Sequence, residues 1–223
     1  SEASTTFDAS DVDVTNGTLS NFAADTTTAG TNGGYTRYTA TFTANSGFSG
    51  TATVGVLNSK FTDIAGNANL DTYAASPTAP VVNDGNNQVS FTVDTVKPTV
   101  SVSTAKTAFD SATTATIYFD FSEPITTTEF VMADIYKSGT GTLSNLVPDT
   151  STGNSSTGYT RYQVTYTPAS GTPSGADNTI IGVAAGKFAD AAGNLNADTY
   201  NSTPAAGEVY EANNQTSVMF GTV

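Results

Sequence analysis

The sequence contains no cysteine and no histidine among its 223 residues. Without cysteine the chain cannot form a disulfide, carry out thiol chemistry or hold zinc through the usual thiolates. Without histidine it lacks the commonest general base and the commonest transition-metal ligand. A glycine-rich phosphate-binding loop is also absent from the sequence. These absences argue against an enzyme.

Charge is scarce and mostly of one sign. Charged residues make up 12% of the chain, and 20 acidic against 7 basic residues give a net charge of −13. We expect no nucleic-acid partner, because binding phosphate requires a basic surface. No run of 18 apolar residues occurs, so we expect no membrane insertion. The acidity serves solubility, or it supplies hard oxygen ligands for Ca²⁺.

The most informative feature is an internal duplication. The segment KFTDIAGNANLDTY at 60–73 returns as KFADAAGNLNADTY at 187–200, with most positions identical. GTLSN and GYTRY each recur 124 positions later, from 17 to 141 and from 34 to 158. Ser1-Glu2 aligns with Ser122-Glu123. The chain therefore reads as two tandem modules, 1–96 and 97–223.

The second module has the alternation and turn residues of an antiparallel β-sandwich. We expect the loop after its second strand to hold Ser122-Glu123, and Gly182 and Gly186 to form bulges. The predicted strands are Thr99–Ser103, Ala115–Phe121, Ala133–Lys137, Gly141–Leu146, Tyr159–Thr167, Asn178–Phe188 and Gln215–Phe220.

The first module is predicted to be N-terminally incomplete. The alignment of Ser1 with Ser122 leaves no counterpart in residues 1–96 for the first two strands, PTVSV and ATIYFDF. A sandwich without them has an unpaired edge and an uncovered core. Either the residues belong to a longer repeat array, or an adjacent copy adds strands. Ser217–Val223 is the candidate donor within this sequence.

Alternating strand directions place carboxylates from three segments near the joint between the modules. Asp94, Glu123 and Asp190 should converge there, with amide oxygens from Asn194 and Asn196. Carboxylates so close repel one another unless a cation lies between them, and irregular oxygen shells suit Ca²⁺. The same logic predicts a second Ca²⁺ site at the upper end of the first module, from Glu2, Asp63, Asn67 and Asn69.

A plainer interpretation stays open for both loops. An Asp-x-x-Gly-Asn stretch can be only a turn, in which Asp and Asn bond their own backbone and Gly supplies a positive φ. Arg37 and Arg161, each flanked by tyrosine, are expected to pack across strands. Paired carboxylates for glycoside hydrolysis would need a cleft, and no loop is long enough to wall one.

The segments SEAST-FDASDVDVTNGTLSNF, YTATFT, GTATVGV, FTDIAGNAN and SFTVDTVKPTV resemble bacterial Ig-like repeats. Such repeats occur in large cell-surface adhesins, including the repeats-in-toxin type that tether biofilms. The resemblance implies an all-β chain of two tandem Ig-like sandwiches, secreted or at the bacterial cell surface. It implies a spacer function with Ca²⁺ at module junctions, and it supports Asp94, Glu123, Asp190 and Asn194 at the joint and Glu2, Asp63 and Asn67 above.

Two other functions remain open at this point. The chain could be a self-assembling subunit of an extracellular filament or surface layer, completed by β-strand addition from a neighbouring copy. It could also be a carbohydrate-binding module with a glycan partner, although the absence of tryptophan weakens an aromatic platform.

Overall fold

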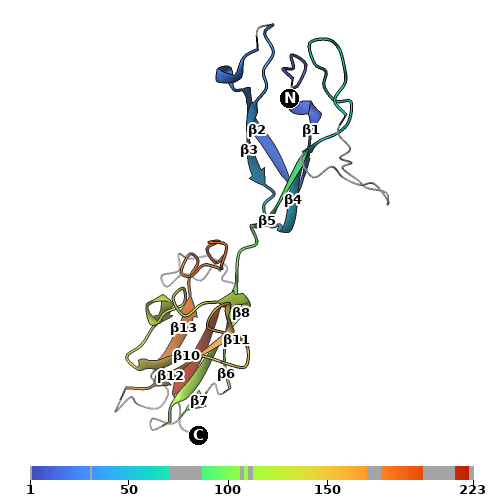
Figure 1. Ribbon diagram of the computed structural model, residues 1–223. Helices are drawn as coiled ribbons and strands as arrows, with labels where there is room; N and C mark the ends of the chain where they lie inside the picture. Colours follow the sequence, from blue (N-terminus) through green and yellow to red (C-terminus); the bar gives the residue numbers. More distant parts are fainter. Residues whose placement is uncertain are drawn as a thin grey trace. The chain divides into compact units, whose positions relative to one another are not determined.

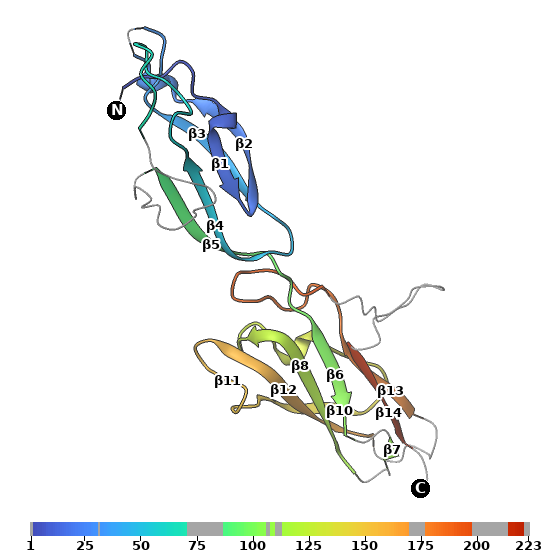
Figure 2. The same cartoon turned by 90° about the vertical axis from the view of Figure 1, so that its right-hand side faces the viewer.

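The computed structural model describes residues 2–30, 32–70, 87–105, 108–109, 113–169, 177–197 and 214–220. The chain divides into two compact units, Ser1–Val96 and Lys97–Val223, which are drawn in Figures 1 and 2. Both are built from β-strands and short 3₁₀ turns, and the expected all-β architecture is confirmed. Among the described residues no helix is long and apolar enough to cross a membrane.

The first sheet of the second unit has five strands, four of them in the order β10-β12-β8-β6 and the short β11 paired with β12. All neighbours in it are antiparallel. Its strands are β6 (Val100–Thr104), β8 (Ala115–Ile125), β10 (Thr142–Pro148), β11 (Gly153–Asn154) and β12 (Gly158–Thr167).

The second sheet of this unit has the order β7-β14-β13-β9. β13 is antiparallel to β9 and β14, whereas β7 runs parallel to β14. A 3₁₀ turn at Met132–Asp134 precedes β9. The strands are β7 (Ala108–Phe109), β9 (Ile135–Lys137), β13 (Asp177–Val183) and β14 (Gln215–Phe220).

The core of the second unit lies between these sheets. Along β8, alternate residues from Ala115 to Phe121 are buried, as the period of two in a strand requires. Side chains from both sheets join one buried cluster, which identifies a sandwich. An aromatic group lies at its centre, with ring centroids 4.9–5.9 Å apart where Phe121 and Phe130 meet their neighbours. Its members are Phe119, Phe121, Phe130, Tyr162 and Phe188.

Two polar contacts fix β12 against β8. The hydroxyl of Tyr162 donates to the carbonyl of Ile125 at 2.8 Å within the core. Arg161 lies opposite Asp120, and its Nε and Nη2 donate to the two carboxylate oxygens, the second at 3.0 Å. The guanidinium carbon also lies 5.4 Å from the ring centroid of Tyr118. A bidentate ion pair of this kind fixes the register of the two strands.

The first unit repeats part of this plan. One sheet has the order β1-β4-β5, the counterpart of β9-β13-β14, and a second has only β2 and β3, the counterpart of β10 and β12. Figure 1 shows the latter pair in blue. Short 3₁₀ turns lie at Ala9–Asp11 and Thr26–Thr28. The strands are β1 (Val12–Thr15), β2 (Gly17–Ala24), β3 (Tyr38–Ala44), β4 (Ser49–Val56) and β5 (Gln88–Asp94).

Burial differs sharply between the two units. Among described residues of the first unit, Ala52 is the one buried hydrophobic side chain, whereas the second unit buries a continuous core. No strand among the described residues of the first unit corresponds to β6 or to the first part of β8. The sheet of β2 and β3 therefore ends at β3, and the β1-β4-β5 sheet lacks the facing strands that β6 and β8 provide in the second unit.

Four details differ from the sequence-based expectations. β8 continues through Ser122 and Glu123 to Ile125, so Glu123 is a strand residue and not a loop residue. The segment predicted as Asn178–Phe188 ends at Val183, where a turn begins. Gly182 pairs regularly with both neighbours rather than forming a bulge. The segment Ala133–Lys137 starts as a 3₁₀ turn, because Asp134 caps it by accepting from the Val131 N–H.

The C-terminal strand was a candidate donor for another copy. β14 instead pairs with β13 and β7 in its own unit, and Val218 is fully buried there. Donating it would remove a core strand from its own unit, so the pairing of Ser217–Phe220 argues against this segment as the donor. Strand addition between copies stays a prediction. The rest of the candidate segment lies outside the described residues.

Candidate metal centre

The repeated loop of the second unit is organised around Asp190. Its Oδ1 accepts hydrogen bonds from the backbone N–H of Ala192 and Asn194, at 2.8 and 2.9 Å, and its Oδ2 accepts from Asn194 Nδ2 at 2.7 Å. Gly193 supplies the positive φ, +90°, that closes this turn. The carboxylate is buried, with 5% of the residue exposed. The turn interpretation of this loop is thus correct for its backbone, and one oxygen lone pair of Asp190 Oδ2 is left by these bonds.

Asn196 braces the same loop. Its amide oxygen accepts from the backbone N–H of Lys187 and Phe188, at 2.7 and 3.2 Å, and its Nδ2 donates to the Ala184 carbonyl at 2.9 Å. Both lone pairs of the oxygen are used by these bonds. The arrangement gives Asn196 a structural part in the loop, although the sequence suggested it as a ligand.

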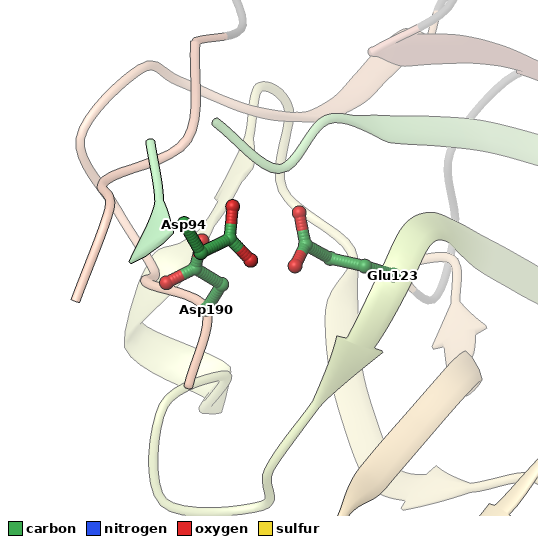
Figure 3. A group of neighbouring side chains, drawn as sticks. All are labelled: Asp94, Glu123 and Asp190. Atoms are coloured by element: carbon green, nitrogen blue, oxygen red, sulfur yellow. The ribbon is translucent and has the colours of Figure 1, made fainter. Parts of the chain in front are cut away.

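Glu123 reaches the same place from the end of β8. The pairing of β8 with β12 is irregular between Asp120 and Ile125, and such irregularities re-aim side chains. A carboxylate oxygen of Glu123 lies within 4.8 Å of one of Asp190, as Figure 3 illustrates. Two carboxylates so close repel each other, and a cation between them would offset this repulsion.

Asp94, also labelled in Figure 3, belongs to the other unit. It is the last residue of β5, and its Oδ1 accepts from the Val96 backbone N–H at 3.1 Å. Its convergence with Glu123 and Asp190 stays a prediction. Chain length permits it, since Asp94 precedes Thr99 by five residues and Thr99 exchanges backbone and side-chain hydrogen bonds with Ser122, the neighbour of Glu123.

The equivalent loop of the first unit repeats the turn around Asp63. Its Oδ1 accepts from the Asn67 backbone N–H and its Oδ2 from Asn67 Nδ2, each at 2.8 Å. These bonds lower the pKa of Asp63. A hydrogen bond between the carboxyl groups of Glu2 and Asp63 raises the pKa of Glu2 above its ordinary value. Asn69 braces the loop as Asn196 does, by accepting from Lys60 N–H and Phe61 N–H.

The Glu2–Asp63 pair leads to a pH prediction. Because the folded-state pKa of Glu2 is raised, its contribution to stability is present at low pH and is lost as the pH rises from about 4.5 through the folded value. Glu2→Gln, measured with chelator present, should remove this dependence and raise the melting temperature of the first unit at pH 7. Asp8→Asn, which also removes one exposed charge of this unit, is the control. An identical pH profile for Glu2→Gln and the unmodified chain would contradict the pairing.

A groove beside this pair was missed from the sequence. It has a volume of about 680 Å³ and lies within the first unit, contrary to the expectation that nothing walls a cleft. Its lining includes Glu2 and Asp63 together with the rings of Phe7, Tyr38 and Phe61. The two carboxyl groups share a hydrogen bond, which is closer than the roughly 5–9.5 Å of glycosidase carboxylate pairs. The sequence did contain a signal for such a groove, because residues 1–96 have no counterpart of the strands PTVSV and ATIYFDF.

Comparisons with known proteins add a family assignment. Searches of curated proteins and of solved structures gave no match. The family model described as a bacterial Ig-like domain matches residues 1–80 and 94–206. The two matched segments cover most of both units, in keeping with the duplicated strand order of the fold. The chain therefore belongs to the bacterial Ig-like domain family.

Proposed function

We propose that these residues are non-catalytic structural modules of a bacterial extracellular adhesin, which space a distal binding part from the cell. The observation that carries the proposal is the joining of two copies of one strand plan by very few residues. Thr95 is held in the first unit by Phe48, and Pro98 is held in the second by Ala197. Only Val96 and Lys97 lie between these anchors, so the link between the two modules is short.

The family supports a structural and extracellular function. Bacterial Ig-like domains are commonly extracellular or at the surface, and they are generally non-catalytic. The groove in the first unit offers carboxylates but no histidine or cysteine, and its carboxyl pair does not fit a hydrolytic arrangement. In this proposal the modules provide length and solubility, and they carry out no catalysis.

We further propose that Ca²⁺ stiffens the joint. The donor set fits a hard cation: Glu123 and Asp190 bring carboxylate oxygens within 4.8 Å of each other, and Asp94 is tethered within about 18 Å of Thr99 by the chain. Asn194 is a further oxygen donor from the same loop. The bound ion would offset the repulsion between carboxylates, and Glu2 with Asp63 and Asn67 would form the corresponding site of the first unit.

A calcium titration tests this joint. With Ca²⁺ at about a hundredfold excess over its dissociation constant, the folded, ion-bound form gains about 2.7 kcal/mol. The melting temperature of the second unit should rise accordingly, and small-angle scattering should show a narrower distribution of particle dimensions than with chelator. Asp190→Asn should abolish most of both responses, because it removes the charge that the ion neutralises.

Two further variants separate the parts of the proposal. Asp149→Asn removes a carboxylate that accepts from Ser151 in a surface turn, and it should leave both calcium responses intact. Asp94→Asn should retain some calcium stabilisation of the second unit while losing the change in particle dimensions. Equal melting temperatures and equal scattering with Ca²⁺ and chelator would rule out the ion at the joint.

A further inference from the structure

The groove of the first unit is lined by aromatic residues whose aligned counterparts in the second unit are buried. Phe7, Tyr38 and Phe61 align with Phe130, Tyr162 and Phe188, each of which is 1% exposed in the second unit. In the first unit the same three side chains are only half-buried and line the groove of about 680 Å³. Their rings still contact one another, with Phe7 centroids 5.0 Å from those of Tyr38 and Phe61. The first unit thus has half of a core.

The second unit shows what covers such a face. The rings of Phe119 and Phe121 on β8 contact Phe130, and Phe121 also contacts Tyr162 and Phe188. β6 pairs with β8 on the edge away from β12, and its Val100 and Val102 join the same buried core. No described residue of the first unit takes these places.

The backbone of residues 2–4 shows where a strand that precedes them would lie. Ser4 pairs with Tyr35 through two backbone hydrogen bonds of 3.1 and 3.0 Å, as Ile125 pairs with Tyr159 in the second unit. The Tyr38 hydroxyl donates to the Ser4 carbonyl at 2.9 Å, as that of Tyr162 does to Ile125. Residues 2–4 therefore occupy the place of the end of β8. A strand that precedes them in the same direction would run along the edge of β3 that faces away from β2.

Charge on this edge points to the same occupant. Arg161 forms its bidentate pair with Asp120 of β8. The equivalent Arg37 lies at the same position beside β3, where its side chain is 71% exposed and 4.0 Å from Asp25, a weak surface contact. A strand added to β3 in the register of β8 would place one residue directly opposite Arg37, and a carboxylate there would restore the pair.

We propose that the groove of the first unit is the docking site for a β-strand pair of the β6–β8 type that leads directly into Ser1. Its second strand adds antiparallel to β3, inserts two large apolar side chains over Phe7 and Phe61, and places a carboxylate opposite Arg37. Main-chain bonds to the edge provide affinity and the alternate side chains provide specificity, as in β-strand addition generally. The proposal does not depend on an ion at either site.

A second copy of this chain is a poorer occupant. Its β6 and β8 carry Val100, Ile117 and Phe119, which are at most 1% exposed in its own core. Lending them would open the second unit in order to close the first. The occupant that we propose is therefore a strand pair joined to the N-terminal side of Ser1, in the order seen in the second unit, rather than a second copy.

The test uses the full chain with a copy of residues 97–121 placed directly before Ser1, so that the copied Phe121 precedes Ser1 as it precedes Ser122. Hydrogen exchange of the β3 amides that face away from β2 should slow by at least about 100-fold relative to the unextended chain. Binding of an apolar fluorescent dye should fall, and light scattering should report a monomer. The same extension with Ile117→Asp and Phe119→Asp in the copy should give no protection.

Charge reversal tests the register. Asp120→Arg in the copied segment should lose most of the protection, and adding Arg37→Asp should restore it. Unchanged β3 exchange in the extended chain would overturn the proposal. β3 amides that are already protected in the unextended chain would overturn it as well. In a monomeric chain this protection would mean that the chain's own residues cover the edge of β3, and in a dimer it would mean that a second copy covers it.

Discussion

Replacing Phe130 by alanine is expected to lower the free energy of unfolding of the second unit by about 3–5 kcal/mol. Phe130 is 1% exposed, and its ring contacts those of Phe119, Phe121, Tyr162 and Phe188. Removing it leaves a cavity that two sheets, held apart by the remaining rings, cannot close. Calorimetry and the exchange of β12 amides would measure the loss.

The matched control is Phe7→Ala. Phe7 is the aligned residue of the first unit, but it borders a groove and is only half-buried. Less apolar surface leaves water when it folds, so its removal should cost clearly less than that of Phe130. Equal losses in the two units would mean that the first unit buries Phe7 as fully as the second buries Phe130.

Much of the fold follows from alternation and duplication. The pattern ATIYFDF predicts a strand with Ile117, Phe119 and Phe121 on one face, and these residues are buried in the core. The end of this strand was not predictable, because Pro124 and the polar pair before it read as a loop. Pairing with β12 resumes at Ile125, beyond a four-residue irregularity that no local pattern encodes.

The turn of the repeated loop was predictable from the sequence, whereas the bonding of each side chain in it was not. Asn194 bonds to Asp190 within the predicted turn. Asn196 and Asn69 have the same spacing from lysine in both copies, and the oxygen of each accepts from two backbone N–H groups. A sequence shows which side-chain oxygens a loop contains. It does not show which of these oxygens accept hydrogen bonds from the loop's own backbone and are then no longer available to a metal ion. The groove could have been predicted, because the alignment leaves no counterpart of β6 and β8 to pack over the aromatic rings of the first unit.

Alkaline pH is expected to destabilise the second unit through Tyr162. Burial raises the pKa of Tyr162 to about 12, because the phenolate would lose its hydration in the core. A tyrosine with a pKa of about 10 in the unfolded chain and about 12 in the folded one binds its proton more tightly when folded. Its contribution is therefore complete below pH 10 and is lost as the pH rises from about 10 to about 12, amounting to about 3 kcal/mol.

Tyr162→Phe separates this effect from the general repulsion of an acidic chain. The variant should lose about 1–2 kcal/mol at pH 7, since the Ile125 carbonyl no longer accepts the buried hydroxyl. Between pH 10 and 12 it should fall less steeply than the unmodified chain, so that the two stabilities converge. Denaturant unfolding across this range, followed by exchange of β12 amides, would measure both slopes. Parallel slopes would show that the Tyr162 hydroxyl titrates alike in the folded and unfolded chain.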